Sequence, residues 1–331
     1  MYRLQVRLVF MQNFIHSSLP PEMQNAPAAP AESESRESIA TNRFIRAVRW
    51  TRLIGHIGAG LFVTGVLFPR VSPASQARIT QWWSQKTLRI LNVKLSVHGA
   101  RPAINAKNLI IAANHISWLD IYVINAAHPA RFVAKAEIRG WPIVGWMCEK
   151  GGTIFIRRTN RRDTARINEE IHDALATGAT IGLFPEGTTT AGDRLLKFHS
   201  SLLEPAVINH ATLAPVALRY CHTDGARCSA AAYIDDLSFA ESLQLIIGQQ
   251  SMIAEITFAP QLSAVGSSRR ALALNAETSI AAILNVAKPD AHQRFGHSGS
   301  AENKTQAGRS SADTTFTPDA ETEASVSVAT P

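Results

Sequence analysis

The sequence has few cysteines and no grouping of residues typical of a metal site. Its three cysteines, Cys148, Cys221 and Cys228, are too few for a disulfide framework, and none has the spacing of a metal ligand. We therefore expect unpaired thiols in a reducing compartment. No cluster of His, Cys and Asp has ligand spacing either, so the sequence predicts no metal cofactor.

Acidic residues are scarce over a large part of the chain. Residues 41–166 contain 20 Lys or Arg and only four Asp or Glu, within a chain of 331 residues and net charge +7. Concentrated positive charge favours an anionic partner, which can be nucleic acid, a phospholipid surface or a phosphorylated ligand. Nucleic-acid binding would call for aromatic residues interleaved with basic ones on a strand face, and the sequence shows no such pattern. We therefore expect no nucleic-acid partner.

Both ends of the chain lack the pattern of a folded core. The first 15 residues are apolar in part, but Gln12 and Asn13 interrupt them and no small-residue cleavage site follows, so we expect no signal peptide. A stretch rich in Pro, Ala, Ser and Glu comes next, and the C-terminal stretch is rich in Ser, Thr, Ala and charge. Such compositions predict disorder over residues 1–40 and 286–331.

No uncharged run between these ends has the length of an ordinary membrane span. The run from Leu53 to Pro69 has 17 residues, about 25 Å as a helix against a hydrocarbon core of about 30 Å. Four arginines precede it at a spacing of three: Arg43, Arg46, Arg49 and Arg52. We expect residues 41–77 to form a membrane-associated helical segment, inserted or re-entrant, whose arginines meet anionic headgroups on the cytoplasmic side. A buried core helix is the alternative.

Residues 78–285 alternate between apolar strands and helices. This pattern is typical of a layered α/β domain with a central mixed, largely parallel sheet flanked by helices. The expected strands cover residues 93–99, 108–113, 131–135, 152–157, 179–185, 212–220 and 251–260. The expected helices cover residues 79–91, 118–127, 140–150, 162–177, 200–209 and 269–284.

A histidine and an aspartate follow the strand expected at 108–113, in the stretch "ANHISWLD". On a continuous helix, His115 and Asp120 would point about 140° apart. If His115 lies in the turn after the strand and Asp120 in the first helical turn, Asp120 accepts a hydrogen bond from one imidazole nitrogen and leaves the other as a base. The chain has 11 histidines, so this spacing alone is weak evidence. In the alternative interpretation, Asn114 or Ser117 caps the helix and His115 is structural.

Two further stretches suggest a phosphate site. In "GLFPEGTTTAGDRLLKF", a buried strand runs into Glu186, Gly187 and Thr188, and turns rich in Gly and Thr can present donors to phosphate oxygens. In "GGTIFIRR", a strand ends near Arg158, and arginine grips phosphate through two parallel hydrogen bonds. The alternatives are an ordinary tight turn and a solvated basic helix start.

Taken in order, these motifs resemble the glycerolipid acyltransferase family, which includes the 1-acylglycerol-3-phosphate acyltransferases. The family block Asn-His-x4-Asp is matched by Asn114, His115 and Asp120. The blocks Gly-x-x-Phe-Ile-x-Arg and Phe-Pro-Glu-Gly-Thr are matched by Gly152, Phe155, Ile156 and Arg158, and by residues 184–188. A fourth block, a short apolar strand containing proline, is similar to "LAPVALRY" with Pro215, and Lys135 lies where the family tends to place a lysine.

The resemblance implies acyl transfer from acyl-CoA or acyl carrier protein to the free hydroxyl of 1-acylglycerol-3-phosphate, giving phosphatidic acid. His115 would remove the hydroxyl proton and Asp120 would orient the imidazole. The implied acceptor-binding residues are Arg158, Glu186, Gly187, Thr188, Lys135 and Asn114. No cofactor is implied beyond the acyl donor. The implied location is the cytoplasmic face of a membrane, with a monotopic or short inserted segment among its phospholipids.

One departure leaves the acceptor open. Where many relatives carry a Lys-Gly pair, this chain has His199, Ser200 and Ser201. Another lysolipid, such as lyso-ornithine lipid, is therefore an alternative acceptor. A lipid-binding protein without turnover is a further alternative. A hydrolase using Ser117 is disfavoured because that serine has no Gly-x-Ser-x-Gly elbow.

Overall fold

The computed structural model describes residues 41–156 and 161–288, with only the backbone for residues 161–165. The disorder predicted for residues 1–40 falls outside the described residues, as does nearly all of the predicted C-terminal tail. Arg158 also lies outside them. These predictions therefore remain predictions.

The described residues alternate between helices and strands along most of the chain. The helices of more than one turn are α2 (Arg43–Phe62), α3 (Pro73–Ile90), α4 (Asp120–Ala127), α5 (Val144–Lys150), α6 (Arg161–Ala176), α7 (Glu204–Ile208), α8 (Phe239–Gly248) and α9 (Arg269–Leu284). The shorter or irregular helices are η3 (Val63–Leu67), η4 (Phe68–Arg70), η5 (Ala136–Gly140), η6 (Ser200–Leu203) and η7 (Ser229–Ala231). The strands are β1 (Val93–Gly99), β2 (Leu109–Ala113), β3 (Arg131–Lys135), β4 (Ile154–Ile156), β5 (Ile181–Leu183), β6 (Thr212–Cys221), β7 (Met252–Phe258) and β8 (Leu262–Ser263).

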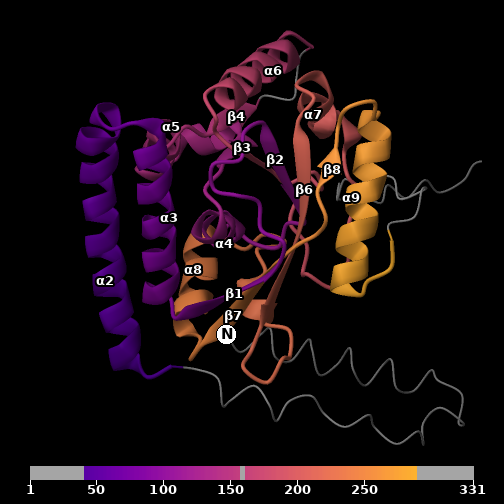
Figure 1. Ribbon diagram of the computed structural model, residues 1–331. Coiled ribbons are helices and arrows are strands. Elements are labelled where there is room, and N and C mark those ends of the chain that lie inside the picture. Colours follow the sequence, from indigo (N-terminus) through magenta and orange to yellow (C-terminus); the bar gives the residue numbers. More distant parts are fainter. Residues whose placement is uncertain (1–40, 157–160, 289–331) are drawn as a thin grey trace, which may run out of the picture. The chain divides into compact units, whose positions relative to one another are not determined.

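The strands form one mixed sheet in the order β1-β7-β6-β2-β5-β3-β4, with β8 paired to β6 (Figure 1). Strand β6 pairs antiparallel with β7 and with β8, and every other pairing is parallel. The predicted fold class, a mixed and largely parallel sheet flanked by helices, is confirmed. Pro215 is tolerated in the middle of β6 because it lies where the antiparallel partner changes from β7 to β8.

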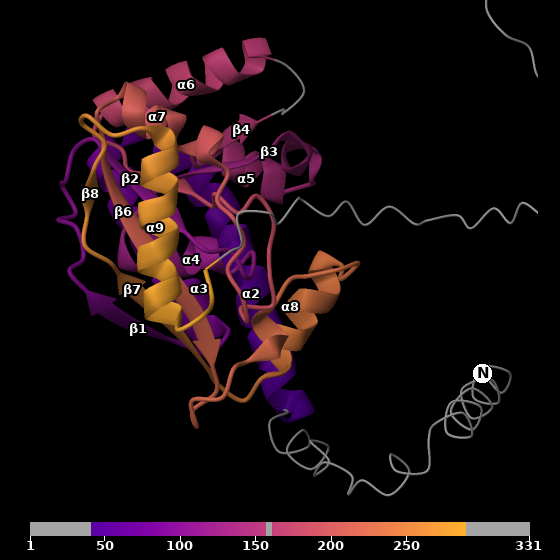
Figure 2. The same cartoon turned by 90° about the vertical axis from the view of Figure 1, so that its right-hand side faces the viewer.

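Helices cover both faces of the sheet (Figures 1 and 2). All five residues of β2 are buried, but alternate ones join different cores: Ile111 packs with α3, α4 and α8, whereas Ile110 packs with α6 and α9. Successive side chains of a strand point to opposite faces, so a strand covered on both sides reads as a continuous apolar run. This explains why "LIIAA" contains no polar residue.

Several element boundaries differ from the predictions for local reasons. The helix expected at 140–150 begins only at Val144, beyond Pro142, and the one expected at 200–209 divides into η6 and α7, with Pro205 in the first turn of α7. Helix α8 and the short strand β8 were not predicted. The strands at 93–99 and 131–135 and the helix at 269–284 have the predicted boundaries.

Helix α2 continues through η3 and η4 and turns back into α3, forming a helical hairpin that we call the N-terminal hairpin (residues 43–90). On its inner face Leu53 joins the core, and His56 stacks on Trp83 with ring centroids 3.5 Å apart. Its outer face is apolar but exposed, as at Phe44 and Phe62. The alternative of a buried core helix describes the inner face of α2, and the membrane association of its outer face stays a prediction. By length and composition alone, the helical run Arg43–Arg70 is long enough to cross a membrane, which is weak evidence that it does.

The prediction that all four arginines of α2 face headgroups is wrong for Arg49. This side chain is buried and donates hydrogen bonds to the carbonyl oxygens of Ile247 (2.8 Å), Gln249 (2.5 Å) and Gln250 (3.1 Å). Carbonyls at a helix C-terminus lack partners within the helix and carry partial negative charge, which a guanidinium satisfies. Arg49 therefore fixes α2 to the end of α8. The boundary predicted between residues 77 and 78 also falls inside α3.

Candidate functional site

The candidate site lies at the carboxyl ends of three neighbouring strands, β5, β2 and β6. Strand β2 is central and runs parallel to both neighbours, with Ala112 beside Leu183 and Ala113 beside Val216. Ligand sites in open α/β sheets form at this edge, because the loops after several strands converge there. The loop after β2 carries His115, and the loop after β5 carries Glu186.

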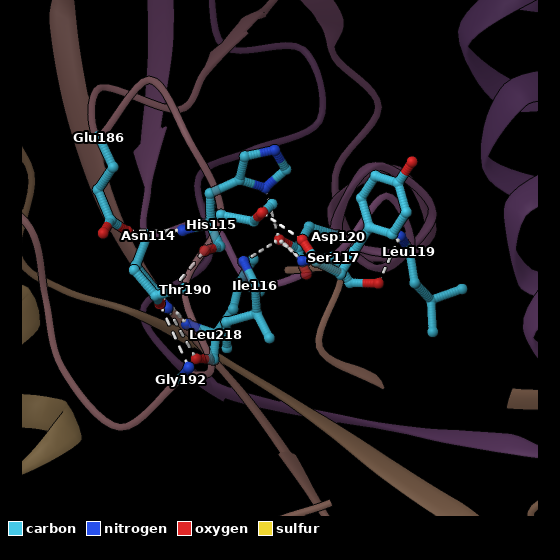
Figure 3. A network of polar contacts seen from close by, with 12 residues as sticks. Asn114, His115, Ile116, Ser117, Leu119, Asp120, Glu186, Thr190, Gly192 and Leu218 are labelled. Atoms are coloured by element: carbon cyan, nitrogen blue, oxygen red, sulfur yellow. Dashed lines mark hydrogen bonds and ion pairs between the residues drawn. The ribbon is translucent and has the colours of Figure 1, made fainter. Parts of the chain in front are cut away.

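His115 and Asp120 are in contact. His115 lies in the irregular turn after β2, and Asp120 is the first residue of α4, so the two are not on a continuous helix. His115 Nδ1 lies 2.8 Å from Asp120 Oδ2, and the other ring nitrogen points away from the aspartate (Figure 3). The contact expected from the sequence is therefore present. Neither Asn114 nor Ser117 caps α4, whose N-cap residue is Leu119.

Asp120 acts as an acceptor in all its contacts. Its Oδ2 also accepts hydrogen bonds from the backbone N–H groups of Ile116 (2.7 Å) and Ser117 (2.9 Å). Its Oδ1 accepts one from the hydroxyl of Tyr220 at 2.6 Å. Because these donors already point at the carboxylate oxygens, Asp120 is an acceptor towards His115 as well. The imidazole proton therefore lies on Nδ1, and Nε2 keeps its lone pair. The site thus holds a histidine in the tautomer that a general base needs.

Tyr220 was not identified from the sequence as a residue of the site. It lies near the end of β6, is buried, and its pKa is raised well above the usual range, mainly by burial and further by Asp120. It therefore remains a hydrogen-bond donor. A tyrosine at the end of an apolar strand could have indicated this contact, because a buried Tyr hydroxyl usually has a polar hydrogen-bond partner.

The remaining surroundings of His115 come from the loop after β5. Its ring stacks on Phe184, with centroids 3.9 Å apart and planes 11° apart. Its backbone N–H donates to Glu186 Oε1 at 2.7 Å, and its carbonyl accepts from the N–H of Thr190 at 2.9 Å. Its side chain is 20% exposed, and no residue in the described ranges hydrogen-bonds to Nε2. The ring is held in one orientation, and the partly exposed side chain leaves Nε2 available to a ligand.

Glu186 joins two loops beneath the histidine. Besides the His115 contact, its Oε2 accepts a hydrogen bond from the N–H of Leu196 at 2.9 Å. The side chain is almost fully buried, and this burial raises the pKa of Glu186 to about 8. The two N–H donors and Arg194 oppose the shift, and Asp120 adds to it. In this structure Glu186 positions the backbone of His115.

The other predicted binding residues are spread around this centre. Asn114 is buried, and its side-chain amide bonds to both the N–H and the carbonyl of Leu218, so it ties β2 to β6. Gly187 has φ +74° and donates its N–H to the carbonyl of Phe184, so this N–H is engaged within the turn. Thr188 and Lys135 are exposed. Among the residues that the structure describes, no group of three His, Cys, Asp or Glu could hold a metal ion.

Comparisons with known proteins agree with one another. The family model "Acyltransferase" matches residues 94–219. The chain is 32% identical over 255 residues to a lyso-ornithine lipid O-acyltransferase from Pseudomonas aeruginosa, covering 75% of this chain and 96% of that protein. It is 34% identical over 246 residues to a 1-acyl-sn-glycerol-3-phosphate acyltransferase from Neisseria meningitidis, covering 72% and 95%. The fold is similar to the crystal structure of a 1-acyl-sn-glycerophosphate acyltransferase from Thermotoga maritima, with a TM-score of 0.56, 20% identity and coverage of 73% and 94%.

Proposed function

This chain belongs to the acyltransferase family, and from that membership and the geometry of the site we propose that it acylates 1-acylglycerol-3-phosphate to give phosphatidic acid. The observation that carries the proposal is the contact between His115 Nδ1 and Asp120 Oδ2 at 2.8 Å, which leaves Nε2 accessible. The acyl donor is a thioester of coenzyme A or of acyl carrier protein. No cofactor beyond this donor takes part.

In the proposed reaction, Nε2 of His115 takes the proton from the acceptor hydroxyl as its oxygen attacks the thioester carbonyl. A new C–O ester bond forms, the C–S bond breaks, and the proton passes to the departing thiolate. Asp120 stabilises the imidazolium that exists between these two steps. General base catalysis of this kind typically contributes 10²–10⁴-fold to the rate. Lys135, Thr188 and Arg158 remain the proposed contacts to the acceptor headgroup.

The protein is proposed to act on a membrane surface, with the N-terminal hairpin as the attachment. Residues 41–92 contain several Arg and Lys but no acidic residue, and the outer face of α2 is apolar and exposed. Such an amphipathic surface favours the interface of an anionic bilayer. Attachment on the cytoplasmic face, without a full span, is part of the same proposal.

The catalytic proposal is tested by His115→Ala, with acyl transfer followed through a labelled acyl group and through thiol release. We expect a loss of at least about 100-fold with unchanged melting temperature, because the ring is the proposed base. His98→Ala, at an exposed histidine of β1, is the matched control and should keep full activity. Activity retained by the His115 variant would refute the mechanism.

A second acceptor, lyso-ornithine lipid, is supported by the similarity to the Pseudomonas aeruginosa protein. The two acceptors are separated by measuring kcat/KM for both in the same mixed micelles, with acyl-CoA and acyl carrier protein tested in parallel as donors. A higher kcat/KM for 1-acylglycerol-3-phosphate, together with growth rescue of a strain lacking its phosphatidic-acid-forming enzyme, supports the first proposal. The reverse preference without rescue selects the alternative acceptor. No turnover with either lysolipid would instead favour a lipid-binding protein of the same fold.

A further inference from the structure

The segment from Trp141 to Trp146, which joins η5 to the first turn of α5, exposes three large apolar side chains. Trp141, Ile143 and Trp146 are 39%, 51% and 38% exposed. Ile143 has φ +64° and ψ −58° and is the centre of a γ-turn, closed by a hydrogen bond from the N–H of Val144 to the carbonyl of Pro142 at 2.6 Å; this conformation is rare and strained. Gly145 packs so closely on η5 that a Cβ atom would lie 2.3 Å from the carbonyl oxygen of Arg139. The segment therefore exposes the Ile143 side chain even though the backbone at this residue is strained.

This segment continues the apolar surface of the N-terminal hairpin. Helix α5 packs beside the end of α2, where the chain turns towards α3 (Figure 1). The Trp146 ring lies 3.2 Å from where a Cβ of Gly65 would be, so the absence of a side chain at Gly65 lets the indole approach η3. Val66 and Leu67 of η3 are themselves exposed. Exposed apolar residues thus run from α2 through η3 to Ile143.

The same segment leads towards the candidate site. The Trp141 ring packs on Phe239 at the start of α8, with centroids 6.1 Å apart. Phe239 in turn packs on Trp118 at 5.0 Å, and Trp118 lies in the turn that connects His115 to Asp120. An unbroken series of aromatic contacts therefore links the exposed surface to the turn that holds the catalytic pair.

We propose that residues 141–146 form a second membrane-contacting element, which enters the bilayer interface beside the N-terminal hairpin. Tryptophan suits this depth because its ring is apolar and its N–H can remain hydrated. A bilayer is favoured over a protein partner because the surface is continuous with a hairpin that carries only positive charge. The inference rests on the proposed membrane attachment and adds that the surface near the site also meets the lipid, so a lysolipid can reach His115 without crossing water.

Ile143→Asn tests this proposal without endangering the fold. The γ-turn conformation is strained for asparagine as it is for isoleucine, and Ile143 is 51% exposed, so the melting temperature should stay close to that of the wild type. Partitioning of the full chain into vesicles of phosphatidylglycerol and phosphatidylethanolamine, measured by cosedimentation, should fall about tenfold, because a polar side chain replaces the isoleucine that is proposed to enter the bilayer interface. Ile104→Asn is the matched control, since Ile104 is 53% exposed on a loop elsewhere, and its partitioning should match that of the wild type.

The proposal is overturned if Ile143→Asn partitions like the wild type, or if both variants lose binding equally. It is also overturned if Ile143→Asn changes the sedimentation coefficient without lipid, because the surface would then join two copies of the chain. Acyl transfer measured in detergent micelles separates this inference from the proposed function. Ile143→Asn should retain wild-type turnover there, whereas an inactive wild type would count against the function and leave the vesicle comparison valid.

Discussion

At the scale of single residues, the candidate site restricts the orientation of one side chain, that of His115. The His115 ring is held by Asp120 at its edge and by Phe184 on its face, and its backbone is held by Glu186. The three contacting residues lie at separate positions in the sequence, and together they leave Nε2 of His115 accessible. In the proposed mechanism, holding the base in its reactive orientation lowers the entropic part of the barrier.

Tyr220 belongs to this restriction, although it does not touch the histidine. Tyr220→Phe removes the 2.6 Å hydrogen bond to Asp120 Oδ1 and leaves a buried carboxylate oxygen without this donor. We expect kcat to fall about tenfold with KM unchanged, since the loss of roughly 1.4 kcal/mol affects only the imidazolium state that Asp120 stabilises. The pH–rate profile should shift as well. Tyr233→Phe is the control, and equal kinetics for Tyr220→Phe and Tyr233→Phe would show that the hydroxyl has no such role.

The raised pKa of Glu186 predicts that the free energy of unfolding depends on pH. Its pKa is about 8 in the folded chain, above its ordinary value of 4.5, so the folded chain binds more protons between these values. The free energy of unfolding should therefore fall as the pH rises from 4.5 to 8, by at most about 1.4 kcal/mol per pH unit from this group. Glu186→Gln removes this contribution, so the melting temperature of the variant minus that of the wild type should increase as the pH rises from 5 to 8. A constant difference would contradict the prediction.

At the scale of elements, the arginines of α2 divide into two kinds. Arg49 is buried against the C-terminus of α8, whereas Arg52 is exposed. Arg49→Met should lower the free energy of unfolding by about 2–4 kcal/mol, because it leaves several buried carbonyl oxygens without a charged donor. Arg52→Met should leave stability unchanged and weaken binding to anionic vesicles by roughly fivefold. Equal effects of the two substitutions on stability would contradict the buried role of Arg49.

Helix α8 was not recognised from its periodicity, although the sequence contains a capping signal at its start. Ser238 and Glu241 form a capping box, in which each side chain accepts a hydrogen bond from the backbone N–H of the other residue. The motif Ser-x-x-Glu before an apolar run predicts such a helix start. Helix α9 was predicted with correct boundaries, whereas α3 begins six residues before its predicted start at residue 79, and α8 required this capping signal.

At the scale of the whole molecule, the sheet order decides which residues meet. The contact between His115 and Asp120 could be predicted because both residues belong to one turn. The contacts of His115 with Phe184, and of Asp120 with Tyr220, could not, because they depend on β2 lying between β5 and β6. Alternating strands and helices predict a layered domain but not the order of its strands. The buried role of Arg49 was missed because it depends on α8, a helix that was not predicted.

The contact between α2 and α8 has a consequence for biosynthesis. Arg49 and Ile247 are separated by 198 residues, so α2 leaves the ribosome long before its partner exists. At about 5–20 residues per second, the delay is about 10–40 s. During this interval the face of α2 that packs on α8 is uncovered, and under the proposed membrane attachment the bilayer covers the apolar outer face. Recruitment to the membrane would then precede completion of the site, and the catalytic domain would assemble on the surface where its substrate resides.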